Sequence, residues 1–166
     1  EIDRIPSRKF LRSYHRECFP LSRDAFYLRD RTPGAPCFAY RPTRGLWTAG
    51  TVTYVALQLA YFMGFDTVIL VGVDHSYVEQ KSFAAGEVPS GERLIVTSQG
   101  NDPNHFSPDY YQPGIPWIVP NPAHTELAYR MAKFAFEREG RQVLDATIGG
   151  RLQVFPKVEY RTLFPS

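Results

Sequence analysis

The sequence predicts an α/β domain, a three-layer Rossmann-like fold with a mainly parallel sheet and a long lid insertion. A helix-spaced apolar segment ends at Gly64, and a continuous aliphatic run follows over residues 67–72. A second helix-and-strand pair then covers residues 122–146. Helix, strand, helix, strand in this order is typical of parallel strands joined by right-handed crossovers.

Composition is that of an ordinary globular protein. The chain has 166 residues, of which 43% are hydrophobic and 22% charged, with a net charge of +2. This balance argues against a nucleic-acid-binding stripe or a membrane-binding tract, and no apolar run is long enough to span a membrane. We expect one domain over 1–166 and, since it begins at Glu1 with no initiator Met, interpret it as the C-terminal part of a longer protein. Cys18 and Cys37 are two isolated cysteines, which fits a reduced cytoplasmic setting, although a single disulfide between them stays an alternative.

The elements follow in order along the chain. Residues 1–46 hold only short apolar runs, KFLRSY, AFYL and CFAY, which we interpret as short strands or turns. The first helix has apolar residues on two sides, which predicts that it packs into the body of the protein. One side carries Val52, Val55, Ala56, Leu59, Phe62 and Met63, and the other carries Tyr54, Leu57 and Tyr61.

After Gly64, the aliphatic run 67–72 predicts a strand buried on both faces of a parallel sheet. A second helix is predicted over 122–139, because Asn121 is a good N-cap, Pro122 suits the first turn and Gly140 ends the pattern. The run 142–146 is predicted to be the next strand. The expected buried stripe of the second helix is Leu127, Met131, Phe134 and Ala135.

Polar residues follow the aliphatic strand abruptly, as Asp74, His75, Ser76 and Tyr77. Ligands of open α/β sheets bind at the carboxyl ends of the strands, so these residues predict a site. Residues 75–120 form a connection long enough to be a lid or an extra subdomain. The alternative is that Asp74 caps a turn and His75 is merely exposed.

A second cluster is the aromatic stretch QGNDPNHFSPDYY, residues 99–111. His105 follows Asn104 and could act as a general base, because its ordinary pKa lies near neutral pH. Tyr110 and Tyr111 could donate hydrogen bonds to a departing phosphate. The alternative is a polar turn with a solvated histidine.

A third cluster is RGLWTAGT, residues 44–51, just ahead of the first helix. Thr48, Gly50 and Thr51 with the free N–H groups of the helix start would seat an anion, and Arg44 could pair with phosphate. A simple helix cap is the alternative. The histidines lack the spacing of a zinc site, so no metal is expected unless Asp74 holds magnesium.

The run TAGTVTYVALQLAYFMGFDTVILVGVDHSY, with the later NHF and the helix and strand over 121–146, resembles the bacterial lipooligosaccharide sialyltransferases. The same run is at least as similar to the family named for 6-hydroxymethylpterin diphosphokinase. The motility-associated flagellin glycosyltransferases are related to that family. The resemblance covers about residues 44–160. It implies phosphate contacts near Gly72, Asp74 and Tyr77, and a catalytic base at His105. Arg44 matches a family arginine only approximately, the family's Asn-Gly-Pro-Ser strand is absent, and His75 replaces an aromatic residue.

The resemblance implies an enzyme that transfers a sugar, such as a sialic-acid-like sugar, from a nucleotide-sugar to a surface glycan or similar acceptor. That reaction needs no cofactor. Its setting would be polysaccharide biosynthesis in a bacterial cytoplasm or at the periphery of the inner membrane, with this chain as the C-terminal part of a longer transferase. One alternative is a pyrophosphokinase that uses ATP and Mg²⁺ on a hydroxymethylpterin-like molecule, with Asp74 holding the metal. A non-catalytic nucleotide- or glycan-binding module is the other, and a homo-oligomer is compatible with all three.

Overall fold

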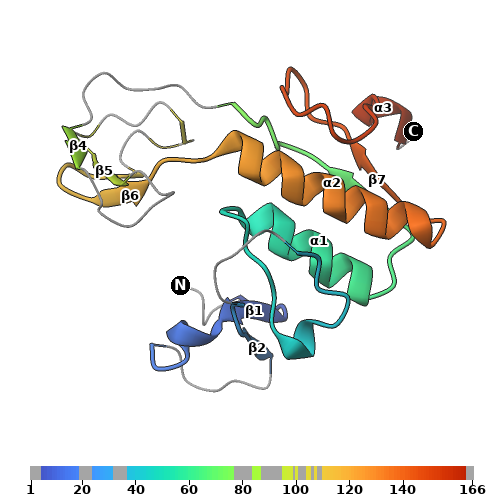
Figure 1. The fold of residues 1–166 in the computed structure, drawn as a ribbon, viewed down its shortest axis with the longest axis horizontal. Coiled ribbons are helices and arrows are strands. Elements are labelled where there is room, and N and C mark those ends of the chain that lie inside the picture. The colour runs from blue at the N-terminus through green and yellow to red at the C-terminus, as the bar shows by residue number, and fades with distance from the viewer. Residues whose placement is uncertain are drawn as a thin grey trace.

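The computed structural model describes residues 5–18, 24–31, 37–76, 95–98 and 110–163, with residues 84–86, 100, 104, 105 and 107 between them. Helices and short strands alternate along the chain, and both parallel and antiparallel pairs occur. Figure 1 shows helices α1 (Val52–Phe62) and α2 (Pro122–Arg138) side by side in the body of the molecule. This helix and strand content fits the predicted α/β class. The described strands form three separate small sheets, so the predicted three-layer Rossmann-like arrangement with one mainly parallel sheet is not shown.

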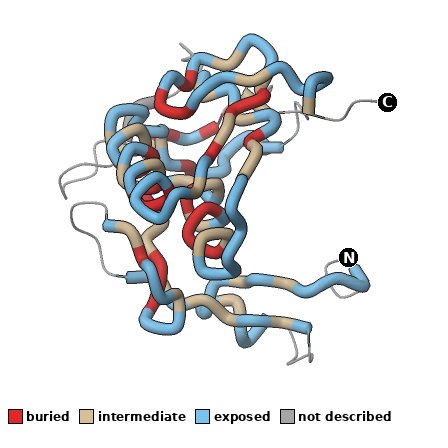
Figure 2. The backbone as a smooth tube through the Cα atoms, turned by 90° about the vertical axis from the view of Figure 1, so that its right-hand side faces the viewer, coloured by how far each residue is buried: buried red, intermediate tan, exposed pale blue. Residues whose placement is uncertain are grey.

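The N-terminal region forms a small sheet of its own. Strands β1 (Lys9–Arg12) and β2 (Ala25–Leu28) pair in parallel, and the rings of Phe10 and Phe26 stack 5.3 Å apart across them. Figure 2 shows this region as mostly exposed or half-buried. Two of the three short runs expected here, KFLR and AFYL, are thus strands, while CFAY is not.

Helix α1 begins and ends where its local signals predict. The Thr51 side chain accepts a hydrogen bond from the N–H of Thr53, and Gly64 follows the helix with φ +85°. The side that carries Tyr54 and Leu57 is buried, whereas Val52 is 80% exposed. The expected burial of the Val52 side is confirmed for Leu59, which forms a buried cluster with Ala39 and Leu46. It is wrong for Val52, Phe62 and Met63, which are exposed.

The central sheet consists of β3 (Thr67–Leu70) and β7 (Gln142–Asp145), which pair in parallel with Thr67 opposite Gln142. Helix α2 lies between these strands in the chain and packs on β7, so it is the predicted crossover. Of the predicted strand residues only Leu70 is fully buried, and Val71 is 60% exposed. The expectation of a strand buried on both faces is wrong, since the described helices cover one face.

Helix α2 buries a different stripe from the predicted one. Leu127 is 49% and Phe134 is 64% exposed, and Met131 is half-buried; of the predicted stripe only Ala135 is buried. Small side chains allow close approach between packed elements, so the alanine-rich side faces the core. The buried residues of α2 are Ala128, Tyr129, Ala132, Ala135 and Phe136.

The long connection contains β4 (Ala84–Gly86) and β5 (Ile95–Thr97), and β6 (Pro116–Ile118) completes an antiparallel sheet with them. Figure 1 shows this sheet beyond the N-terminal end of α2. The C-terminal segment after β7 adds the buried residues Leu152, Val154 and Phe155 to the core and ends in the short helix α3 (Tyr160–Leu163). Within the described residues, no helix has both the length and the apolar character needed to cross a membrane.

Candidate functional site

A tight polar turn follows β3. The Asp74 carboxylate accepts hydrogen bonds from the hydroxyl of Ser76 at 3.0 Å and from its backbone N–H at 3.4 Å. His75, between them, has φ +52°, a left-handed conformation that few residues other than glycine adopt. Asp74 thus caps the turn, as the simpler of the two interpretations expected, and it also remains exposed to solvent.

The turn rests against the first half of α2. The Nε2 atom of His75 lies 3.4 Å from the Oε1 atom of Glu126, and its ring meets the ring of Tyr129 at a centroid distance of 6.2 Å. Nε2 is buried and makes no hydrogen bond to any described residue, so the carboxylate faces it only at ion-pair distance. Only 12% of the His75 side chain is exposed. His75 is therefore a packed residue, not a solvated one.

The N-terminal turn of α1 reaches the same part of α2. The backbone carbonyl of Ala49 accepts a hydrogen bond of 3.4 Å from the hydroxyl of Thr125, the neighbour of Glu126. The N–H of Thr51 donates to the carbonyl of Thr48, which closes the turn ahead of the helix. At Gly50, no described atom lies within 4 Å of the place where a Cβ would stand. Gly50, just ahead of α1, therefore borders open space.

The loop after β7 completes this end of the sheet. The hydroxyl of Thr147 accepts a hydrogen bond from the N–H of Val73 at 3.0 Å, and the N–H of Arg151 donates to the carbonyl of Asp74 at 2.7 Å. The Arg151 side chain is exposed. The carboxyl ends of both parallel strands thus meet here, where ligands of α/β sheets usually bind.

Sequence reasoning missed four residues that the structure brings to this end of the sheet. For Arg151 a signal was present, because it follows a Gly-Gly pair just after a predicted strand. Thr125 and Glu126 gave no such signal, because they occupy ordinary positions in helix α2. The missed residues are Thr125, Glu126, Thr147 and Arg151.

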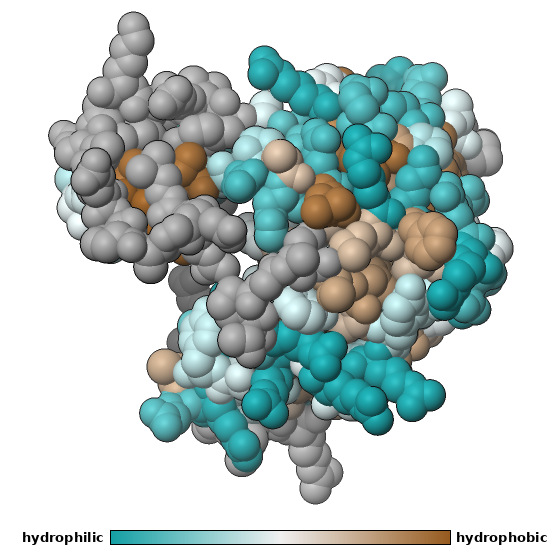
Figure 3. Space-filling model, viewed as in Figure 1, coloured by the Kyte–Doolittle hydropathy of each residue, from teal (hydrophilic) through white to brown (hydrophobic). Residues whose placement is uncertain are grey.

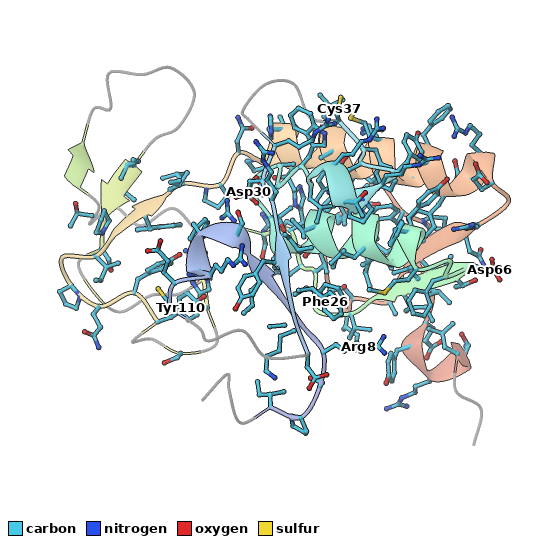
Figure 4. The ribbon with its side chains drawn as sticks, turned by 90° about the horizontal axis from the view of Figure 1, so that it is seen from below. Arg8, Phe26, Asp30, Cys37, Asp66 and Tyr110 are labelled. Atoms are coloured by element: carbon cyan, nitrogen blue, oxygen red, sulfur yellow. The ribbon has the colours of Figure 1, made fainter. Side chains whose placement is uncertain are left out.

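The predicted base His105 belongs to a second group beside β5 and β6. Its ring stacks on Tyr110 with centroids 4.1 Å apart and meets Tyr111 edge-on at 5.2 Å, while Tyr111 stacks on Trp117. Asn104 is half-buried next to it. Figure 4 shows Tyr110 at the end of the molecule that carries the three-stranded sheet. His105 is thus held in an aromatic cluster, and Tyr77 lies outside the described residues.

The remaining predicted residue, Arg44, ends a short 3-10 helix (Pro42–Arg44) ahead of Gly45. Arg44 is exposed, and the N–H of Leu46 donates a hydrogen bond of 2.8 Å to the carbonyl of Arg29, next to β2. In the described part of the chain, no group of three or more His, Cys, Asp and Glu side chains could hold a metal ion. Both cysteines are free and exposed.

The chain was compared with protein families, curated proteins and solved structures. No family model matches the chain, and no curated protein or solved structure matches it. The geometry of the two residue groups is therefore the basis for a functional assignment.

Proposed function

We propose that this protein is a glycosyltransferase of the three-layer Rossmann-like kind, which binds a nucleotide-sugar at the carboxyl ends of β3 and β7. One observation carries the proposal. The N-terminal turn of α1 and the polar turn at Asp74 both contact the first half of α2, at Thr125 and Glu126. An anion seat and a set of hydroxyl-binding groups thus share one end of the sheet.

The phosphates of the donor would lie at the start of α1. Backbone N–H groups at a helix N-terminus bind phosphate well, and the space beside Gly50 leaves room for it. Thr48 and Thr51 would donate hydroxyl hydrogen bonds. The exposed guanidinium of Arg151 would add positive charge from the β7 side, a role that Arg44 was expected to fill.

The sugar or ribose hydroxyls would bind at the turn after β3. A carboxylate at a strand end commonly accepts hydrogen bonds from ribose hydroxyls, and the Asp74 carboxylate is exposed. Ser76 would contribute a second polar group, and His75 would support the turn from its packed position against Glu126 and Tyr129.

Sugar transfer to an acceptor needs a base that removes the hydroxyl proton. We assign this role to His105, whose stacking on Tyr110 would hold the imidazole in one orientation. In this scheme Tyr77, Tyr110 and Tyr111 would donate hydrogen bonds to the leaving phosphate, which requires the group beside β5 and β6 to lie against the start of α1. Asn104 would contact the substrate beside His105. No metal takes part in this reaction scheme.

The test is calorimetric titration with CMP, CDP, UDP and ATP, each with EDTA and with Mg²⁺. We expect a cytidine or uridine nucleotide to bind in EDTA. Asp74→Ala should then weaken binding about 10–100-fold, the loss expected for a hydrogen bond to a charged group. The matched control is Asp66→Ala, because Asp66 is an exposed aspartate that precedes the same strand.

Three results would contradict the proposal in different ways. Binding of ATP alone, and only with Mg²⁺, would favour the pyrophosphokinase. Equal losses in the Asp74 and Asp66 variants would move the ligand away from the carboxyl end of β3. A protein that binds none of the four nucleotides would not be a nucleotide-sugar transferase.

A further inference from the structure

Helix α2 carries a second apolar stripe that its own fold leaves exposed. Leu127, Met131 and Phe134, which we call the α2 seam, follow one another at spacings of four and three residues. Their exposure reaches 64% at Phe134, whereas the opposite side of the helix is buried. This spacing is the a and d pattern of helices that pack along their length against another helix.

Two residues of the α2 seam, Met131 and Phe134, line one wall of a groove. The segment 37–40 forms the other wall, with Cys37, Phe38 and Tyr40 facing Arg130, Met131 and Phe134. Figure 3 shows apolar residues gathered over this part of the molecule and bordered by hydrophilic ones. A contiguous apolar surface of this kind usually marks an interface.

The charges that flank the α2 seam are balanced. Arg130 pairs with Glu126 and Lys133 pairs with Glu137, each at 3.8 Å within the helix. An acidic or basic partner would find as many repelling as attracting groups. A partner with the same alternation of charge fits better, because opposite charges can then face each other.

We propose that the α2 seam is the interface of a two-fold homodimer, in which α2 packs antiparallel against α2 of a second copy. A two-fold axis between Met131 and Phe134 sets Met131 of one copy opposite Phe134 of the other. The same register brings Arg130 of one copy towards Glu137 of the other. Met131, Phe134 and the Arg130–Glu137 pair are thus self-complementary in this register.

The first test is sedimentation equilibrium of the whole chain from about 1 to 500 µM, the range in which a weak dimer dissociates. We expect a reversible monomer–dimer equilibrium. Phe134→Glu should raise the dissociation constant at least ~100-fold, since each change acts twice across the two-fold axis. Phe62→Glu is the matched control, because Phe62 is an exposed phenylalanine on α1, with 52% of its surface accessible; it should leave the constant unchanged.

The second test is a charge swap that does not rely on the apolar contacts. Arg130→Glu and Glu137→Arg should each weaken the dimer, and the double variant should restore it, because opposite charges then face each other again. Circular dichroism would verify that each variant keeps its helix content. Three outcomes would each overturn the antiparallel α2 dimer. The protein could be a monomer at every concentration, Phe134→Glu and Phe62→Glu could have equal effects, or the double variant could dimerise no better than the single variants.

Discussion

At the scale of single residues, Gln58 shows how one buried polar side chain can hold a loop to a helix. It is fully buried in α1, and its amide makes four hydrogen bonds. Oε1 accepts from the N–H groups of Ala39 and Trp47, and Nε2 donates to the carbonyls of Trp47 and Tyr54. The side chain therefore satisfies backbone groups of the 39–47 segment that lie away from water.

Gln58→Leu should lower the free energy of unfolding by about 2–5 kcal/mol. The leucine has a similar size but leaves the two N–H groups without an acceptor, and each unsatisfied buried group costs about 1–3 kcal/mol. Urea unfolding measures the change. Gln142→Leu is the control, because the Gln142 amide is exposed and donates only to the hydroxyl of Thr67, so its effect should stay within about 0.5 kcal/mol. Equal losses in the two variants would contradict a special role for Gln58.

At the scale of elements, the ends of the helices follow short-range chemistry. The Asn121 side chain accepts a hydrogen bond from the N–H of His124 at 3.1 Å, and Pro122 occupies the first turn of α2. At the other end, Gly140 has φ +70°, a conformation that glycine adopts without strain. These contacts lie within a few residues of one another, so they do not depend on the rest of the fold.

Asn121→Ala should lower the free energy of unfolding by about 1 kcal/mol, the usual contribution of an N-cap side chain. Asn121→Ser should recover most of the loss, because the serine hydroxyl can accept the same N–H. Thermal and urea unfolding of the three proteins, compared at one pH, give the values. Equal stability of the alanine and serine variants would mean that the cap does not stabilise α2.

At the scale of the whole molecule, Asp145 joins the sheet to the C-terminal segment. Its side chain is fully buried at the end of β7, where Oδ2 accepts from the Nζ atom of Lys157 at 2.6 Å and Oδ1 accepts from the N–H of Thr147. Burial alone would raise the pKa of this carboxyl, but the hydrogen bonds from Lys157 and Thr147 outweigh burial and hold the pKa below its ordinary value. The charged form is therefore favoured by folding.

Asp145 should make the protein sensitive to acid. A lowered pKa in the folded state adds stability above the ordinary value of 3.8, and this stability is lost as the pH falls through the lowered pKa. Asp145→Asn should cost about 1–3 kcal/mol at neutral pH, because the ion pair with Lys157 is lost, and should flatten the decline below about pH 4. Urea unfolding between about pH 2 and 7 tests both effects, with Asp66→Asn as the exposed control. An unchanged acid decline in Asp145→Asn would show that another group causes it.

The candidate site was predictable in part. The polar turn at Asp74 and the proposed anion-binding segment at Gly50 and Thr51 stand out locally, because each interrupts or begins a regular element. Their convergence on α2 at Thr125 and Glu126 was not predictable, since those residues look like any others on a helix. His105 and Tyr110 are only five residues apart, and the sequence placed them in one cluster, but it did not predict that their rings stack or that Tyr111 stacks on Trp117.

What the sequence determined by itself are the features that need only neighbouring residues. The positions of α1, α2, β3 and β7, the caps at Thr51 and Asn121 and the glycines that end the helices follow from apolar spacing, local hydrogen bonding and backbone freedom. The sequence also determined that the fold is α/β, because the alternation of helices and strands is a property of the chain order.

Only the tertiary structure decided which surfaces are buried. Helix α2 has two apolar stripes, and either could face a core by spacing alone. The alanine-rich stripe faces inward, because small side chains let the helix approach α1 and β7 closely, and this leaves Phe134 in solvent. The division of the strands into separate small sheets, and the pairing of Asp145 with Lys157, depend likewise on contacts between segments distant in the chain.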